Sequence, residues 1–377
     1  MAKRIPLDNV CVKKIPTLSS QYDGLIDYVD ISSVDNTEKR IVSMQCVSAK
    51  EAPSRAKQLL KAGDILVSTV RPNLNAVAMV EQKTDNLMVG STGYCVLRCN
   101  DSIDKRYVFH FCQSPYFVDD MTSQATGASY PAVSSGIVKS ATIPDHPIET
   151  QKQIADRMDK VSELIALRKK QLAKLDQLVK SRFIELFGDI QKEDKLINLC
   201  NFIDYRGKTP EKAERGLPFI TAKNVKMHYM SFDTQEFISK ETYDKVMTRG
   251  FPQIGDVVFT TEAPLGNVCR IPYIETEFYI GQRIITMQTE LLEPAYLEYA
   301  LSSDDFKRKI AEKSSGSTVT GIRSKLLEQL TVPVPPRADQ KKFAAFVEQT
   351  DKSKLTIQQS LDKLELLKKA LMQEYFG

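Results

Sequence analysis

Two stretches of the chain carry hydrophobic residues at steps of three and four, the spacing of one helix face. Charged residues, mostly lysine, aspartate and glutamate, fill the other faces. A stripe this narrow is typical of a coiled-coil seam, so we predict long helices over 151–190 and 339–377. Pro147 and Pro335-Pro336 limit their extension backwards. The first stripe comprises Val161, Ile165, Leu172, Leu175, Val179 and Leu186, and the second Ile357, Leu361, Leu364, Leu367, Leu371 and Tyr375.

The segments 1–150 and 191–338 predict two mixed globular domains. Short apolar runs predict strands, among them DILVSTV, AVAMV and YCVLRC in the first segment and DVVFTT and RIITMQ in the second. Residues 107–117 and 296–309 predict short helices at matching places in the two halves. Each half therefore has the same order: a mixed globular part, a turn rich in Gly, Ser and Thr, a Pro-bearing strand and a long helix.

The second half of the chain repeats the first. Gly63-Asp64-Ile65-Leu66 recurs as Gly255-Asp256-Val257-Val258, a shift of 192. A shift of 189 relates Ile143-Pro144 to Val332-Pro333, Gln151-Lys152 to Gln340-Lys341, and Phe187-Gly188 to Phe376-Gly377. A repeat of this length indicates a duplicated domain rather than a solenoid unit. Two similar units in one chain can face a two-part target with pseudo-two-fold symmetry.

Two stripes of similar length favour helices that pair with each other, in antiparallel orientation. The alternative is that each helix packs only on its own domain. From 162 to 187 a helix spans about 39 Å at about 1.5 Å per residue. One turn of DNA is about 34 Å. An antiparallel pair of this length would hold the two domains roughly one turn of DNA apart.

Composition and charge fit a soluble globular protein. The 377 residues are 42% hydrophobic and 27% charged, and a net charge of +4 is too small for a general polyanion binder. No apolar run approaches a membrane span, and the N-terminal MAKRIPLDNV lacks the apolar core of a secretory signal. The seven scattered cysteines fit reduced thiols. We therefore expect a cytoplasmic protein that does not contact a membrane.

Motifs for catalysis and metal binding are missing from the sequence. None of the three histidines stands in a zinc-binding pattern, and no phosphate-binding loop or nucleophile turn occurs. Asp64 with Glu81-Gln82-Lys83 is the nearest approach to a nuclease carboxylate cluster, but its repeat at Asp256 lacks such a triplet. The chain also lacks the Asn/Asp-Pro-Pro-aromatic segment of amino-methyltransferases. We predict no catalytic residue, no metal site and no cofactor in this chain.

The order of these motifs resembles the specificity subunit of type I restriction-modification enzymes. Both copies have the Gly-Asp turn, a Gly/Ser/Thr turn (125–129 and 315–318), an Ile/Val-Pro strand and a following Gln-Lys pair. The second copy also carries Gly207-Lys208-Thr209-Pro210 and a Leu217–Thr221 strand, a pattern frequent in the target-recognition domains of that family. The first copy lacks the Gly-x-Thr-Pro segment. The resemblance covers essentially the whole chain.

The resemblance implies an α+β fold with two similar mixed α/β target-recognition domains, separated by two long antiparallel coiled-coil helices. It implies a non-catalytic subunit in which each domain recognises one half of a split, asymmetric site in double-stranded DNA. The helices would set the spacer and dock two modification subunits, which carry S-adenosylmethionine and methylate adenine. A further restriction subunit would use ATP and Mg²⁺ to translocate and cut DNA.

Base recognition needs side chains with donors and acceptors, while phosphate contacts fix the register. The candidates lie on polar loops next to apolar strands. In the first domain they are Arg71, Asn73, Asn75, Thr126, Ser129 and Lys139; in the second they are Arg206, Lys208, Thr209, Lys223, Asn224, Ser317, Thr318, Arg323 and Lys325. For each, the alternative is an ordinary turn residue held by side-chain-to-backbone bonds.

Two other functions remain open. The near-neutral charge favours a coiled-coil scaffold that joins proteins without contacting DNA. The second is a stand-alone nuclease or methyltransferase, which the absence of catalytic motifs disfavours.

Overall fold

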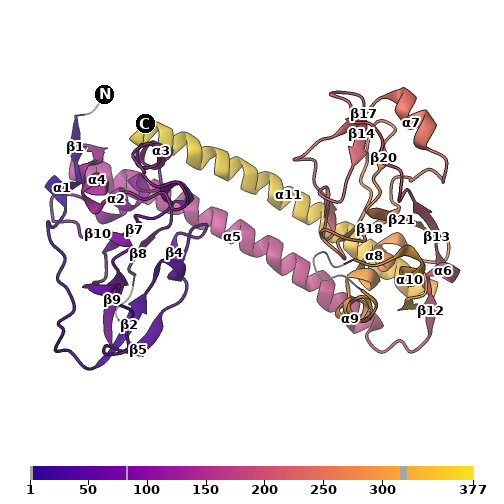
Figure 1. The fold of residues 1–377 in the computed structure, drawn as a ribbon, viewed down its shortest axis with the longest axis horizontal. Helices are drawn as coiled ribbons and strands as arrows, with labels where there is room; N and C mark the ends of the chain where they lie inside the picture. The colour runs from indigo at the N-terminus through magenta and orange to yellow at the C-terminus, as the bar shows by residue number, and fades with distance from the viewer. Residues whose placement is uncertain (1–2, 82–83, 315–320) are drawn as a thin grey trace. The chain divides into compact units, whose positions relative to one another are not determined.

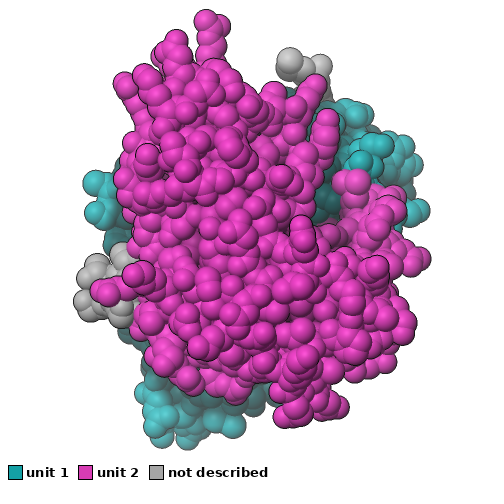
Figure 2. All heavy atoms as spheres, turned by 90° about the vertical axis from the view of Figure 1, so that its right-hand side faces the viewer, with its two compact units in different colours: residues 1–171, 357–377 teal, residues 172–356 magenta. Residues whose placement is uncertain are grey.

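The computed structural model describes residues 3–81, 84–314 and 321–377. The chain separates into two compact units, shown in different colours in Figure 2. Unit 1 comprises residues 1–171 and 357–377, and unit 2 comprises residues 172–356. Each unit therefore holds one of the two predicted globular segments together with parts of both long helices. No helix in the described part of the chain is long and apolar enough to cross a membrane.

Unit 1 is a mixed structure of small sheets and short helices. Its central sheet has the order β10-β7-β8, and a second sheet has the order β5-β2-β9-β6, in which β2 and β9 are parallel. β1 pairs with β11, and β3 with β4. The strands are β1 Arg4–Pro6, β2 Leu25–Val29, β3 Val34–Asp35, β4 Arg40–Ile41, β5 Gln45–Ser48, β6 Ala56–Leu59, β7 Ile65–Ser68, β8 Val77–Met79, β9 Leu87–Ser91, β10 Tyr94–Leu97 and β11 Thr142–Pro144. The short helices are α1 Leu7–Val10, η1 Ile31–Ser33, η2 Pro72–Leu74, α2 Lys105–Phe111, α3 Pro115–Ser123 and α4 Ser135–Ser140.

Unit 2 repeats this plan. Its sheets have the orders β13-β21-β18-β19 and β17-β14-β20, with β14 and β20 parallel, and the pairs β12-β22 and β15-β16. The strands are β12 Glu193–Lys195, β13 Asn201–Asp204, β14 Leu217–Ile220, β15 Val225–Lys226, β16 Tyr229–Met230, β17 Phe237–Ile238, β18 Val257–Thr260, β19 Val268–Arg270, β20 Tyr279–Ile280, β21 Ile284–Gln288 and β22 Thr331–Pro333. The short helices are α6 Leu196–Leu199, α7 Lys240–Val246, α8 Pro294–Ser302, α9 Asp304–Lys313 and α10 Ser324–Leu327.

The structure confirms the duplication predicted from the sequence. The outer elements β1, α1, α2, α3 and β11 correspond to β12, α6, α8, α9 and β22 with a shift of 189. The central strand β7 corresponds to β18 with a shift of 192. The shift of 189 therefore belongs to the outer elements and the shift of 192 to the central sheet. Compared with the first copy, the second copy is three residues longer before the central sheet and three residues shorter after it. The five predicted strands are confirmed as β7, β8, β10, β18 and β21.

The prediction of a single short helix at 107–117 and another at 296–309 was wrong, because each is a pair of helices. The break lies at Ser114 in unit 1 and at Ser303 in unit 2. Each serine hydroxyl accepts a hydrogen bond from the amide of the third residue after it, at 3.2 Å in both units. This N-cap starts a new helix, and Pro115 at the first helical position ends the previous one.

The two long helices are confirmed, and they begin three and two residues earlier than predicted (Figure 1). α5 spans Ile148–Phe187 and α11 spans Arg337–Phe376, so each begins directly after a proline. A buried glutamine fixes each start. Gln151 Oε1 accepts from the Asp104 amide at 2.9 Å, and its Nε2 donates to the His146 carbonyl at 2.7 Å. Gln340 makes the equivalent bonds to the Glu293 amide and the Pro335 carbonyl, which explains the glutamine of the repeated Gln-Lys pair.

Within each unit the long helices pack against each other in antiparallel orientation. In unit 1, Arg157 donates to Tyr375, and Lys169 pairs with Glu365. In unit 2, Lys354 pairs with Asp176, and Phe343 packs against Phe187 at 5.5 Å between ring centroids. Of the predicted seam, Val179 and Leu361 are buried, and Leu367 is 45% exposed. Val161 is also buried. All other residues of the predicted seam are half-buried: Ile165, Leu172, Leu175, Leu186, Ile357, Leu364, Leu371 and Tyr375.

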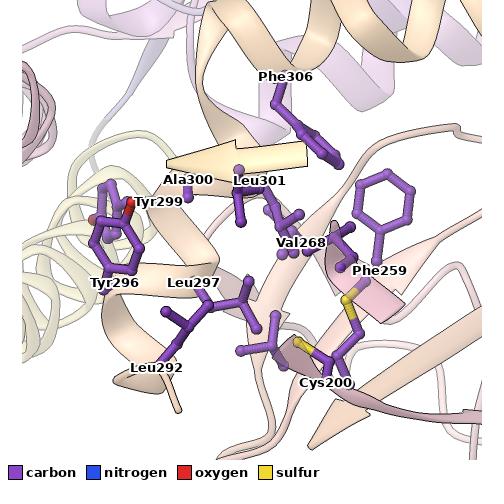
Figure 3. Close-up of a cluster of buried hydrophobic side chains, with 14 of the residues drawn as sticks. Cys200, Phe259, Val268, Leu292, Tyr296, Leu297, Tyr299, Ala300, Leu301 and Phe306 are labelled. Atoms are coloured by element: carbon purple, nitrogen blue, oxygen red, sulfur yellow. The ribbon is translucent and has the colours of Figure 1, made fainter. Parts of the chain in front are cut away.

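Each helix ends in the core of the unit that holds the other copy of the globular domain. Met372 and Phe376 of α11 belong to the core of unit 1, where the Phe376 ring lies 5.2 Å from Tyr107. Phe187 of α5 lies 4.8 Å from Tyr296 in the core of unit 2. Figure 3 shows that core around Tyr296, with Phe306 of α9 directed toward Phe259 of β18. The phenylalanine of each repeated Phe-Gly therefore completes the hydrophobic core around the other copy of the globular domain.

Candidate nucleic-acid interface

The repeated Gly-Asp turn supports the central sheet of each unit. Asp64 is 1% exposed and accepts from Arg98 Nε and Nη2 at 2.8 and 2.7 Å and from the Lys61 amide at 2.8 Å. The preceding Gly63 has φ +93°, which favours glycine. Asp256 instead accepts from the Gln253 amide and Gln288 Nε2, and burial raises the pKa of its carboxyl. Both turns thus use their carboxylates to hold strands.

No metal centre forms around these carboxylates in the part of the chain that the structure describes. There, no group of three or more His, Cys, Asp or Glu side chains is placed to hold a metal ion.

In unit 1 the structure brings the two predicted DNA-binding segments together. The Arg71 amide donates to the Pro131 carbonyl at 2.7 Å, and Thr126 and Ala132 exchange backbone hydrogen bonds at 2.9 and 3.0 Å. The Arg71 guanidinium lies 4.7 Å from the centre of the Tyr130 ring, and Tyr130 is 68% exposed. We call this arrangement of residues 69–75 and 124–133 the unit 1 loop pair. It presents a cation and an aromatic face to solvent.

Other predicted residues at this loop pair have different roles. Asn73, Thr126 and Ser129 are exposed. Asn75 is held internally, because its Nδ2 donates to the Cys112 carbonyl at 2.8 Å and its Oδ1 accepts from Lys39 Nζ at 2.6 Å. Its side chain therefore shapes the loop, which is the turn role that the sequence left open.

Lys39 adds positive charge beside this loop and was not a sequence candidate. Burial, together with repulsion from Lys368, lowers the pKa of Lys39 to about 8. Burial and the charge of Lys169 likewise lower the pKa of Lys368. Two crowded ammonium groups favour a nearby anion. The sequence gives no sign of this, because residues 39 and 368 meet only through the fold.

Lys139 lies on α4 and is held elsewhere. Its Nζ donates to the carbonyls of Val12 and Lys13 at 3.2 and 2.7 Å. The ammonium is therefore directed at the segment that follows α1.

In unit 2 three predicted residues share the loop 204–209. Arg206 and Lys208 are half-buried, and Thr209 is exposed with its hydroxyl 3.3 Å from Gln282 Oε1. Arg249 Nη1 donates to the carbonyls of Asp204 and Arg206 at 2.9 and 2.8 Å, so a second arginine borders the loop. Arg249 was missed because its contact with this loop depends on the tertiary fold.

Lys223 and Asn224 form a turn after β14 and differ in exposure. Lys223 is exposed, whereas Asn224 is 3% exposed. The Asn224 Oδ1 accepts from the Thr221 amide and hydroxyl at 2.9 Å, and its Nδ2 donates to the carbonyls of Ser231 and Thr234 at 3.0 and 2.8 Å. All four hydrogen-bonding positions of the amide are used within the chain. Asn224 therefore holds the turn that carries Lys223.

A second loop pair in unit 2 corresponds to that of unit 1. The Ile322 amide donates to the Thr261 carbonyl at 3.0 Å, as the Val133 amide donates to Thr69 at 2.9 Å. Arg323 and Lys325 lie exposed just after this contact, and Arg283 pairs with Glu262 at 2.9 Å beside it. Ser317 and Thr318 fall outside the described residues. We call residues 261–266 and 321–325 the unit 2 loop pair.

The two loop pairs have the same backbone arrangement but different side chains. Arg71 in unit 1 and Ala263 in unit 2 occupy equivalent positions, with φ values of 50° and 44°. An exposed arginine is therefore matched by an alanine at the same backbone geometry. Sheets that hold polar loops at fixed positions are typical of binding proteins, in which the loops provide recognition and the scaffold provides rigidity.

The fold is therefore a duplicated domain in which a long helix follows each copy, and each copy carries an equivalent pair of polar loops with different side chains. The family model for the type I restriction modification DNA specificity domain matches residues 8–177 and 192–366. The chain therefore belongs to this family, as its motifs indicated.

Individual relatives agree with this assignment. The chain is 24% identical over 281 residues to the type I restriction enzyme MjaVIII specificity subunit of Methanocaldococcus jannaschii, a match that covers 67% of this chain and 65% of the relative. It is also 24% identical over 377 residues to the putative MjaX specificity subunit of the same organism, which covers 91% of this chain and 84% of that one.

Two solved structures share the fold. One is the type I restriction-modification S subunit of M. genitalium, with a TM-score of 0.62, 16% identity and coverage of 100% of this chain and 96% of the other. The other is a chain from a study of complex assembly and conformational transition of the type I R-M system. Its TM-score is 0.60 at 24% identity, and the match covers 99% of this chain and 97% of the other.

Proposed function

We propose that the chain is a non-catalytic DNA sequence-recognition subunit of a type I restriction-modification complex, acting in the cytoplasm. Each unit would recognise one half of a split, asymmetric site in double-stranded DNA. The observation that carries this proposal is the pair of equivalent loop frames with unlike side chains, Arg71 facing solvent in one and Ala263 in the other. Equivalent frames suit two segments of one duplex, and unlike side chains suit different base sequences.

The exposed polar residues divide into two proposed roles. Arg71 and Asn73 carry the donors and acceptors suited to guanine and adenine edges, and Tyr130 supports the Arg71 guanidinium. Hydroxyl and ammonium groups suit phosphate contacts, which fix the register. In this second role we propose Thr126, Ser129, Lys208, Thr209, Lys223, Arg323 and Lys325, with Arg206 beside them. We leave out Lys139, because its ammonium already donates to the Val12 and Lys13 carbonyls. Asn75 and Asn224 act indirectly by shaping the loops.

The long helices would set the length of DNA left unread between the half-sites. α5 and α11 are each 40 residues long without interruption, about 60 Å at about 1.5 Å per residue. Inserting seven residues into one helix adds about 10 Å, or roughly three base pairs. We expect a longer spacer or loss of activity, and an active complex with the original spacer would contradict this role.

The helices would also dock two modification subunits, which bind S-adenosylmethionine and methylate adenine. Large apolar side chains remain exposed along both helices, as partner surfaces often do. They are Leu164, Leu167, Leu366 and Leu367 in unit 1 and Leu178, Ile184 and Leu355 in unit 2. In unit 2 a cavity of about 920 Å³, lined in part by Phe183, Ile184 and Tyr299, extends this surface. A restriction subunit using ATP and Mg²⁺ would complete the complex.

Co-expression tests the proposal. The chain is produced together with its modification subunit in a host that lacks both, and adenine methylation is mapped across the genome. We expect one two-part motif with a fixed spacer, absent when either protein is produced alone. A methylation pattern identical to that of the host would contradict the proposal.

A coiled-coil scaffold that does not contact DNA is the second candidate, supported by a net charge of only +4. The two functions differ in the expected effect of charge reversal at Arg71, Lys208 and Arg323. A scaffold would keep full methylation activity in these variants. A DNA-recognition subunit would lose affinity, because a reversed charge repels phosphate.

A further inference from the structure

Two cysteines in unit 1 face each other across an antiparallel pairing. Cys11 follows α1 and Cys99 follows β10, and the two residues form an antiparallel bridge. The bonds on either side run from the Val12 amide to the Arg98 carbonyl at 2.8 Å and from the Asn100 amide to the Val10 carbonyl at 2.9 Å. Cys11 and Cys99 are therefore a non-hydrogen-bonded pair.

This geometry suits a disulfide. Opposite residues in a non-hydrogen-bonded pair have Cα atoms about 4.5 Å apart. Disulfides span Cα separations of about 4.4 to 6.8 Å, so the backbone need not move far to join the two sulfurs. All seven cysteines are free thiols in this structure.

The duplication provides a natural comparison at the same place in unit 2. Cys200 occupies the position of Cys11 there, directly before β13. Because Asn201 pairs with Gln288, the residue opposite Cys200 is Thr289, in the position of Cys99. The same frame therefore holds two thiols in unit 1 and a thiol with a hydroxyl in unit 2.

The two thiols differ in access and acidity. Cys11 is 4% exposed, whereas Cys99 lines a cavity of about 490 Å³ together with Lys61, Lys105 and Lys152. A hydrogen bond from Cys99 and the charge of Lys139 lower the pKa of Cys11 although burial opposes them. The same hydrogen bond, together with burial, raises the pKa of Cys99. The buried thiol is therefore the better thiolate, and the accessible thiol is the better site of entry.

We propose that Cys11 and Cys99 form a reversible oxidation site that closes to a disulfide by exchange with a low-molecular-weight disulfide. Cys99 loses its proton and attacks one sulfur of glutathione disulfide, whose S–S bond breaks and releases one glutathione thiol that takes up this proton. The Cys11 thiolate then attacks Cys99 Sγ, breaks the mixed S–S bond and releases the second glutathione, protonated by the proton that Cys11 gave up. The two protein thiols are oxidised, and one glutathione disulfide is reduced to two thiols.

The test uses the full-length chain carrying Cys46→Ser, which removes the exposed thiol. The protein is equilibrated in glutathione redox buffers of graded ratio, quenched with acid, alkylated and analysed by peptide mass mapping and thermal melting. We expect a peptide linked through Cys11 and Cys99 in the oxidising buffers, with a loss of two hydrogens and an upward shift in Tm. Closing a long loop stabilises the folded state against the unfolded one.

Two matched variants decide the outcome. Cys99→Thr copies the pair found in unit 2 and should abolish both the linked peptide and the Tm shift. Thr289→Cys copies the pair of unit 1 into unit 2 and should produce a second linked peptide through Cys200. Full alkylation of Cys11 and Cys99 after equilibration in the most oxidising buffer would overturn the proposal, as would linkage of either residue to Cys95 or Cys112. The test is independent of DNA recognition.

Discussion

At the scale of residues, Asp64 and Asp256 occupy the same turn but differ in their partners. Asp64 receives two hydrogen bonds from the Arg98 guanidinium, and Asp256 receives its bonds from neutral groups. Removing one member of a buried ion pair leaves an uncompensated charge, whereas an amide can replace a carboxylate that binds only neutral donors. The same turn is therefore stabilised by an ion pair in unit 1 and by neutral hydrogen-bond donors in unit 2.

This difference predicts unequal costs for the same substitution. Asp64→Asn should lower the free energy of unfolding of unit 1 by about 3 kcal/mol. Asp256→Asn should change that of unit 2 by less than about 1 kcal/mol. Urea unfolding with hydrogen exchange resolved by unit measures both, and equal losses would contradict the contrast.

The two variants should also differ in pH dependence. Burial raises the pKa of Asp256, so the folded chain holds this proton more tightly than the unfolded chain. Its stabilising contribution is complete below the ordinary value of 3.8 and is lost as pH rises through the raised pKa. Asp256→Asn should flatten the unfolding free energy of unit 2 against pH across this interval. An unchanged profile would show that another group is responsible.

Sequence could place the candidate residues on loops but could not tell exposed ones from structural ones. Arg71 and Lys223 follow strand patterns and are exposed as expected. Asn75 and Asn224 carry the same local signal, yet their amides are used within the fold. Which amide is satisfied depends on distant partners such as Cys112 and Thr234. Arg249 and Lys39 were missed for the same reason.

At the scale of elements, periodicity and proline positions predicted both long helices and the strands β7, β8, β10, β18 and β21. What the ends of the helices pack against was not predictable, because Phe187 and Phe376 lie in the core of the opposite copy. A stripe shows that a face is apolar but does not show which domain covers it. The breaks at Ser114 and Ser303 did have a local signal, a serine N-cap before a new turn, which the apolar spacing of the two flanking helices concealed.

Because the end of α11 packs in unit 1, a substitution there should destabilise unit 1 and leave unit 2 unaffected. Phe376 is fully buried in unit 1, so Phe376→Ala should cost about 3–5 kcal/mol in that unit. Hydrogen exchange should therefore speed up in α2, although α2 lies more than 250 residues away in the chain, and stay unchanged in α8. Leu366→Ala on the same helix is the control, because Leu366 is 70% exposed. Faster exchange in α8 rather than α2 would contradict the packing.

At the scale of the whole molecule, the exposed apolar residues of the long helices should bind the modification subunit without contributing to the stability of the fold. Leu355→Glu and Leu366→Glu place a charge at positions that are 61% and 70% exposed. We expect an unchanged Tm but a loss of at least about tenfold in affinity for the modification subunit, since a buried unpaired charge is costly at an interface. Titration calorimetry measures the affinity, and Lys352→Glu, on the polar face, is the matched control. Wild-type affinity in both leucine variants would place the docking surface elsewhere.

We propose that the two units recognise two different halves of one DNA site. To test this, adenine methylation is mapped with a chain in which the recognition part of unit 2, residues 201–323, is replaced by the equivalent segment of a relative. We expect a motif with one half unchanged, the other half new and the same spacer. A motif altered in both halves, or not altered at all, would contradict it.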